Sequence, residues 1–189
     1  MGVGLDITII TGVVLVLIVL VFYFVLTYNG LVGLKNNIAK NWSNIDVLLK
    51  QRSQELPLLV DTVRGYMKHE KDVLETLTKA RIDIMSAKSV SEKAKADLVI
   101  SESLKSVFAV AESYPDLKAN SNFLKLQDRI SGLENEIADR REFFNDSVNN
   151  YNIKIESFPD VFIANMLKLE KKDLFSVNDS EKAAVDVKV

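Results

Sequence analysis

ITIITGVVLVLIVLVFYFVL, from Ile7 to Leu26, is an apolar run of twenty residues without a single charge. At about 1.5 Å per residue it covers roughly the 30 Å hydrocarbon core of a bilayer. A cleaved secretory signal peptide is the rival interpretation, but it would need a basic N-terminal region and small residues at the cleavage site. The N-terminus MGVGLD has no Lys or Arg, and Phe22-Tyr23-Phe24 stands where small residues are needed. The run therefore predicts an uncleaved transmembrane helix over residues 7–27.

The charges that flank this run predict its orientation. Only Asp6 precedes it, whereas Lys35 and Lys40 follow it closely. Cytoplasmic flanks of membrane helices are enriched in Lys and Arg. We therefore expect residues 1–6 to form a short extracytoplasmic N-terminus, and residues 28–189 to lie on the cytoplasmic side of the cell (inner) membrane.

The part of the chain after the run has almost no net charge. It holds all 24 basic residues and 25 of the 26 acidic ones, finely mixed. A nucleic-acid-binding surface would need a clustered basic patch, so nucleic acid is not an expected partner. The chain has no cysteine, which excludes disulfides and thiolate metal sites and fits a reducing compartment.

Helical periodicity continues beyond the apolar run. Apolar residues recur at three- and four-residue steps from Leu31 to Leu49 without a proline, so one helix from about Ile7 to Gln54 is expected. Pro57 fits the first turn of a second helix, which carries apolar residues as far as Ile84.

Two further helices follow. Ser89 with Glu92 three residues later predicts a capping box at the start of a third helix, which should stop near Tyr114, before a proline. The longest apolar stripe then runs over about 33 residues, from Phe123 to Ile155. It predicts a fourth helix of roughly 50 Å.

The pattern as a whole predicts an all-α protein, because no segment shows the sustained alternation of a strand. Four long helices with short connections indicate an antiparallel, up-down-up-down four-helix bundle that follows a single N-terminal transmembrane helix. The expected boundaries are residues 1–6 for the N-terminus, 7–27 for the transmembrane helix, 28–169 for the cytoplasmic bundle and 170–189 for a polar, flexible tail.

The residues of catalytic and metal sites are sparse. His69 is the only histidine, and no Glu-x-x-His motif is present, whereas a di-iron bundle needs that motif on two helices. The sequence also lacks a glycine-rich phosphate loop and a nucleophile elbow. We therefore expect no catalytic residues, no metal site and no cofactor.

Two charged residues fall on apolar stripes. Glu70 occupies a core position of the second helix, and Arg140 does the same on the fourth. An unpaired buried charge costs several kcal/mol, so two buried charges should find partners, and each of these residues is a candidate partner for the other. The alternative is that the stripes rotate and both side chains reach solvent.

The segment after the fourth helix combines apolar and basic residues. Pro159 should break the chain, and apolar residues then recur at helical steps close to several lysines; they are Phe158, Phe162, Met166 and Leu169. This mixture is typical of a short interfacial helix beside anionic lipid. The alternative is that these side chains close the base of the bundle.

Several long motifs resemble those of the LemA family. They are YNGLVGLKNNIAKNWSNIDVLLKQRSQELPLLVDTVRGYMKHEKDVLETLTKAR (Tyr28–Arg81), AESYPDLKANSNFLKLQ (Ala111–Gln127), ENEIADRREFFNDSVNNYN (Glu134–Asn152) and IESFP (Ile155–Pro159). The tail Asp173–Val189 matches only loosely, so nothing is carried over there. The resemblance implies a single-pass bacterial or archaeal membrane protein with a helical, bundle-like soluble domain, and it brings no established enzymatic activity and no cofactor.

These features together predict a non-enzymatic, membrane-anchored helical module that acts as a scaffold or self-assembling platform. The expected partners are the lipid bilayer, further copies of the chain and an unidentified protein. One alternative is a membrane-organising or remodelling protein that polymerises laterally. Another is a ligand-binding sensor or a bundle enzyme with a small molecule between its helices.

Overall fold

The computed structural model describes residues 2–67 and 70–176, apart from the side chains of residues 2–6 and 8. All regular structure in these residues is helical, which confirms the all-α prediction. The helices are α1 (Gly2–Arg64), α2 (Lys71–Ser86), α3 (Val90–Ala111), α4 (Pro115–Lys118), α5 (Ser121–Glu156) and α6 (Asp160–Met166). His69 and the tail beyond residue 176 lie outside the described residues.

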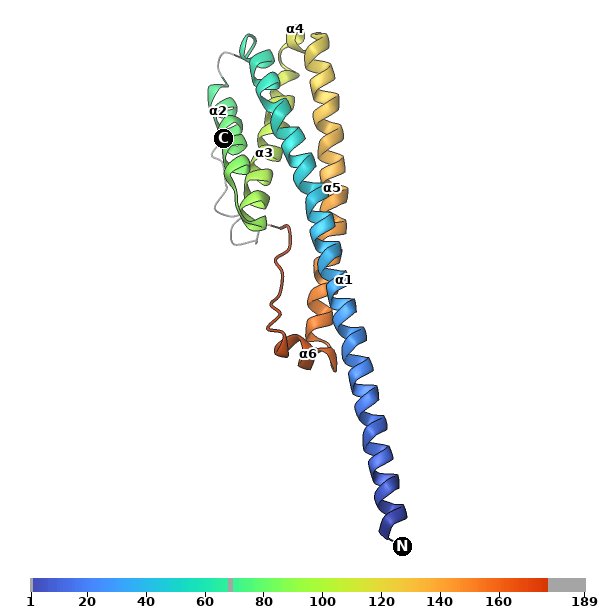
Figure 1. Cartoon of the computed structure of the whole chain (residues 1–189). Coiled ribbons are helices and arrows are strands. Elements are labelled where there is room, and N and C mark those ends of the chain that lie inside the picture. The colour runs from blue at the N-terminus through green and yellow to red at the C-terminus, as the bar shows by residue number, and fades with distance from the viewer. Residues whose placement is uncertain (1, 68–69, 177–189) are drawn as a thin grey trace. The chain divides into compact units, whose positions relative to one another are not determined.

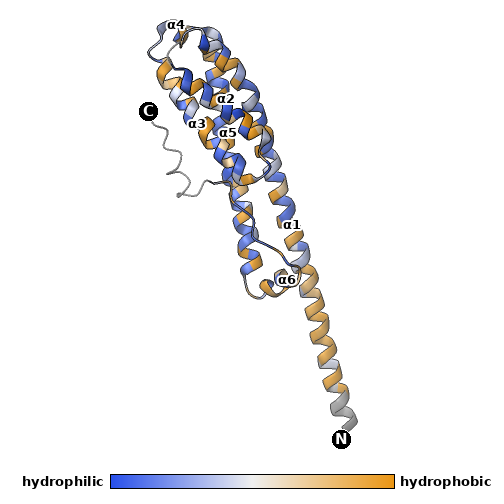
Figure 2. Ribbon diagram, turned by 90° about the vertical axis from the view of Figure 1, so that its left-hand side faces the viewer, coloured by the Kyte–Doolittle hydropathy of each residue, from blue (hydrophilic) through white to orange (hydrophobic). Residues whose placement is uncertain are grey.

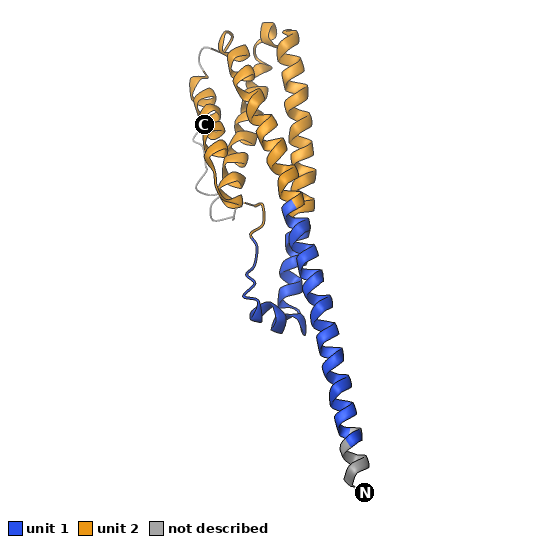
Figure 3. Ribbon diagram, viewed as in Figure 1, with its two compact units in different colours: residues 1–39, 147–172 blue, residues 40–146, 173–189 orange. Residues whose placement is uncertain are grey.

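Chain contacts divide the protein into two compact units, coloured separately in Figure 3: residues 1–39 with 147–172, called unit 1, and residues 40–146 with 173–189, called unit 2. In unit 2 the helices α1, α2, α3 and α5 alternate in direction, as the up-down-up-down prediction requires (Figure 1). Buried aliphatic residues from all four fill the core of this unit; they include Ile45, Leu59, Leu77, Ile100 and Ile137.

The first helix is longer than the sequence predicts. Pro57 was expected to open a second helix, but it lies inside α1, which continues to Arg64. A proline within a helix removes the hydrogen bond to the carbonyl four residues earlier. That carbonyl belongs to Ser53, and it accepts a hydrogen bond from Arg81 Nε at 2.9 Å instead. Because α2 supplies the missing donor, α1 passes through Pro57 and α2 begins only at Lys71.

The other helix boundaries follow local sequence signals. Ser89 and Glu92 form the expected capping box at the start of α3. Asn120 caps α5, since its Oδ1 accepts from the backbone N–H groups of Asn122 and Phe123. Lys168 adopts a left-handed conformation (φ 51°) directly after α6 and so ends that helix.

The N-terminal part of α1 differs from every other helix in its surface. It is apolar all round, whereas the helices of unit 2 mix apolar and polar residues (Figure 2). Its side chains are exposed from Ile9 to Phe22, with exposed fractions such as 61% for Leu15 and 63% for Ile18. Among the described residues, α1 is the one helix long and apolar enough to cross a membrane, with a mean hydropathy of 3.2 in its apolar window.

Candidate functional site

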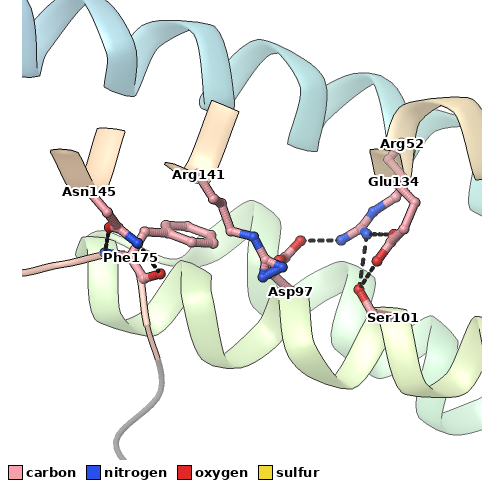
Figure 4. A network of polar contacts seen from close by, with 7 residues as sticks. All are labelled: Arg52, Asp97, Ser101, Glu134, Arg141, Asn145 and Phe175. Carbon is pink, nitrogen blue, oxygen red and sulfur yellow. Dashed lines mark hydrogen bonds and ion pairs between the residues drawn. The ribbon is translucent and has the colours of Figure 1, made fainter. Parts of the chain in front are cut away.

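Unit 2 contains a cluster of buried charges that joins three of its helices (Figure 4). Arg52 of α1 is fully buried and pairs with Asp97 of α3 and Glu134 of α5. Its Nη1 also donates to Ser101 Oγ at 3.3 Å, and Ser101 in turn donates to Glu134. We call Arg52, Asp97, Ser101 and Glu134, together with Arg141 below, the buried charge cluster.

Arg141 of α5 balances the charges of this cluster. Its Nη1 lies 3.4 Å from Asp97 Oδ2, so two guanidinium groups face two carboxylates. Burial raises the pKa of Asp97, while the charges of Arg52 and Arg141 oppose that rise. The arrangement therefore ties α1, α3 and α5 together through ion pairs, although the buried Arg52 Nε and Asp97 Oδ2 have no hydrogen-bond partner among the described residues.

Arg52 and Asp97 were not predicted as buried charges, although the sequence around each of them carries a signal. Arg52 lies three residues after Leu49 and four before Leu56, on the apolar stripe of α1. Asp97 lies three residues before Ile100, on the stripe of α3. The same reasoning that singled out Glu70 and Arg140 applies equally to these two positions.

The structure does not bring Glu70 and Arg140 together. Glu70 lies at the N-terminus of α2, is half-buried, and accepts hydrogen bonds from the hydroxyl of Tyr114 at 3.0 and 3.1 Å. Arg140 is exposed and places its guanidinium 5.9 Å from the centroid of the Phe143 ring. The expected buried pair is therefore wrong: the stripe of α5 rotates Arg140 toward solvent, and Glu70 finds a neutral partner.

The start of the expected tail is fastened to unit 2. The backbone N–H of Phe175 donates to Asn145 Oδ1 at 2.8 Å, and Asn145 Nδ2 donates back to the Phe175 carbonyl at 3.4 Å. The Phe175 ring is buried, 6.0 Å from the ring of Trp42 and 5.4 Å from the guanidinium of Arg141. Residues 173–176 thus belong to the folded unit, a role that their polar neighbours concealed in the sequence.

In unit 1, Asp160 connects α6 to the apolar part of α1. Its Oδ1 accepts hydrogen bonds from Tyr23 and, at 3.1 Å, from Thr27. Its Oδ2 lies 2.6 Å from Lys154 Nζ on α5. Burial opposes ionisation of Asp160, but the bonds from Lys154, Tyr23 and Thr27 outweigh it and hold the pKa of the carboxyl below its usual value. We call these four side chains the Asp160 clamp.

The apolar residues expected at the membrane surface separate into two groups. Phe158, Phe162 and Met166 are exposed, with 80%, 66% and 62% of their surfaces accessible. Leu169 instead packs against the buried cluster of unit 1, which includes Leu31, Tyr151, Ile155, Ile163 and Ala164. Leu169 is half-buried, so this packing agrees with the alternative that these side chains close the base of the bundle, while its contact with a membrane stays a prediction.

An open groove of about 810 Å³ lies between the end of α1 and α2 in unit 2. Met67, Leu74 and Ile82 give it an apolar floor, and Arg64, Lys71, Glu75 and Lys79 add charges around it. Three of these charged side chains are basic and one is acidic.

The fold and these contacts define a class of protein: an antiparallel helical bundle with one N-terminal helix that, by length and composition, can cross a membrane. Comparison with known sequences gives the family. A sequence model of the LemA family matches residues 41–189, so the chain belongs to that family. The chain is also similar to Protein LemA of Metamycoplasma hominis, with 31% identity over 173 residues, which is 88% of this chain and 77% of that protein.

These matches confirm the resemblance to the LemA family found in the motifs, and they extend it to the C-terminal end of the chain. The family match reaches residue 189, whereas the motif comparison carried nothing over in the tail from Asp173 to Val189. It therefore includes Phe175, whose backbone and ring are fixed against Asn145 and Trp42.

Proposed function

We propose that this chain is a non-enzymatic, single-pass membrane protein whose cytoplasmic helical bundle acts as a self-assembling interaction platform. The observation that carries the proposal is the double role of α1. Its N-terminal part exposes apolar side chains all round, and the same helix supplies Ile45, Arg52 and Leu59 to the core of unit 2. The folded unit is thus built on the helix that would anchor it.

The orientation rests on charge. Lys35 and Lys40 are exposed and follow the apolar run, whereas Asp6 precedes it. The bias of Lys and Arg toward the cytoplasm supports a cytoplasmic bundle. The run itself, from Ile7 to Leu26, has the length of a bilayer core.

The non-enzymatic role is supported by what the charged side chains do. Arg52, Asp97 and Glu134 neutralise one another within the bundle, which is the behaviour of a structural cluster rather than of groups held ready for a substrate. The LemA family, moreover, is not a known enzyme family.

Self-assembly follows from confinement to a membrane. Molecules held in one plane meet at a high effective concentration, so weak lateral contacts are sufficient. Exposed apolar side chains on α1 and α2 offer such contacts; they include Leu58, Ile82 and Met85, with exposed fractions of 54%, 58% and 56%.

Energy transfer in liposomes tests the proposed assembly. Because the chain has no cysteine, a Ser113→Cys variant of the full-length protein can be labelled at one exposed site with a donor or an acceptor. We expect transfer above the level of random proximity, decreasing when unlabelled protein is added in excess. Transfer that only follows the random-proximity curve at every protein-to-lipid ratio would contradict the platform.

A ligand-binding role is the second candidate, and the groove beside Met67 and Ile82 favours it. Native mass spectrometry of the protein extracted in mild detergent would detect a retained small molecule. A bound mass that disappears on substituting Lys71 and Lys79 together would place the ligand in this groove.

A further inference from the structure

The short helix α6 has apolar residues on both of its faces. One face packs Ile163 and Ala164 against the buried cluster of unit 1. The other leaves Phe162 and Met166 exposed. Phe158, two residues before α6, is also exposed, and its ring lies 5.9 Å from the Phe162 ring, edge to face. Leaving a phenylalanine side chain in water forgoes about 1.5–3 kcal/mol of burial free energy. Three such exposed side chains within nine residues of sequence form an apolar patch, and patches of this kind are typical of surfaces that contact a partner.

The Asp160 clamp fixes this patch at a defined level along α1. Thr27 directly follows the apolar run, and Tyr23 lies three residues inside its end, which is about 4.5 Å along a helix axis. Asp160 bonds to both. A bilayer that covers Ile7 to Leu26 therefore ends at the level where α6 is attached.

The chemistry of the clamp fits the boundary between hydrocarbon and head groups. A carboxylate at this depth needs partners, and Asp160 has three: the Tyr23 and Thr27 hydroxyls and the Lys154 ammonium. Beyond it, the exposed Lys168 and Lys172 supply positive charge, which anionic head groups attract, whereas Lys171 pairs with Glu156 at 2.7 Å.

Resting on the membrane anchoring proposed above, we propose that residues 157–166 form an interfacial foot, held at the inner end of the span by Asp160, which inserts Phe158, Phe162 and Met166 into the lipid surface. The foot binds the chain's own bilayer, so the protein contacts lipid at two places instead of one. Amphipathic segments lie at this boundary with their apolar side chains some 5–10 Å deep.

Depth-dependent quenching tests the foot in the full-length protein. Single-cysteine variants Met166→Cys, Leu15→Cys and Asn37→Cys are labelled with a small fluorophore and reconstituted into vesicles of phosphatidylcholine and phosphatidylglycerol. The vesicles carry spin labels either near the head group or deep in the acyl chain. Asn37 is an exposed residue of α1 that lies eleven residues beyond Leu26, about 16 Å past the hydrocarbon boundary.

We expect the label at residue 166 to be quenched severalfold more strongly by shallow than by deep spin labels. The label at residue 15 should show the reverse preference, and the label at residue 37 should be quenched little by either. Phe158→Ser with Phe162→Ser should reduce quenching at residue 166 severalfold. Ile153→Ser is the matched control, because it removes another apolar side chain of unit 1 that is 62% exposed, and it should leave the quenching unchanged.

Failure of the foot is distinguishable from failure of the anchor. If residue 15 is deeply quenched and residue 166 is quenched no more than residue 37, the foot is wrong and the anchor stands. If residue 166 is shielded from an aqueous quencher without quenching by lipid, a protein surface covers the patch and the foot is again wrong. If residue 15 is not quenched either, the anchoring itself is wrong.

Discussion

Replacing Arg52 with methionine should lower the free energy of unfolding by about 3–5 kcal/mol, the cost of breaking a buried ion pair by removing one partner. Methionine keeps most of the aliphatic volume, so the loss reports on charge rather than on a cavity. Asp97, which is fully buried, would keep only the 3.4 Å contact with Arg141. Urea unfolding in mild detergent, followed by Trp42 fluorescence, measures the change, since Trp42 contacts Phe144 and Phe175 within the same unit.

The pH dependence of this variant has a definite sign. Burial already raises the pKa of Asp97, and Arg52 opposes the rise, so removing Arg52 raises the pKa further. A carboxyl whose pKa is higher in the folded state destabilises that state once it ionises. The penalty of Arg52→Met should therefore be smallest well below pH 4, where Asp97 holds its proton in both the folded and the unfolded state, and should grow as the pH rises.

A double substitution tests whether the stability lost in Arg52→Met comes from the broken ion pair. Arg52→Met combined with Asp97→Leu removes both buried charges and should recover most of the stability, because well-packed apolar residues can replace a buried pair. Glu134 and Arg141 are each about one-third exposed and can turn to water. Arg140→Ala, on the exposed face of α5, is the control and should cost less than about 0.5 kcal/mol. A double variant as unstable as Arg52→Met would contradict the role given to the ion pair.

Two arginines in the middle of the apolar run should remove most of the protein from the membrane. At the centre of a membrane helix each arginine costs about 2.5–3.5 kcal/mol, so Val16→Arg with Leu17→Arg costs about 6 kcal/mol. The measurement is the fraction of protein that remains with the membrane after carbonate extraction.

The matched control places the same two charges on α2. Ile82 and Met85 are 58% and 56% exposed, close to the 56% and 55% of Val16 and Leu17. If the exposed surface of α2 faces water and that of the apolar run faces lipid, Ile82→Arg with Met85→Arg should leave the membrane fraction unchanged. Equal membrane fractions for the two double variants would contradict the anchor.

Most of the helices could be predicted from the apolar periodicity and from local capping and proline signals, because these depend on residues only a few positions apart. The capping box of Ser89 and Glu92 and the stop before Pro159 are examples. The passage of α1 through Pro57 could not be predicted in this way, since the donor that replaces the lost hydrogen bond is Arg81, which lies 28 residues later.

The contacts of the charged residues could not be predicted either, because their partners are far away in the sequence. The apolar stripes of α1 and α5 place Arg52 and Arg140 at equivalent positions, but the rotation of each packed helix buries Arg52 and leaves Arg140 exposed. Arg52 finds its partners 45 and 82 residues away, at Asp97 and Glu134. Asp160 meets Tyr23 across 137 residues. No local pattern marks such pairs, whereas the apolar residues that follow Pro159 were visible in the sequence.

The side of the membrane on which the bundle lies is the most direct test of the proposed account. A Ser113→Cys variant in intact cells is treated with a membrane-impermeant maleimide, before and after the inner membrane is permeabilised, and Gly4→Cys serves as the reciprocal site. If the bundle is cytoplasmic, residue 113 should be labelled only after permeabilisation, and residue 4 should be labelled in cells whose inner membrane is intact. Labelling of residue 113 with the inner membrane intact would contradict the cytoplasmic placement.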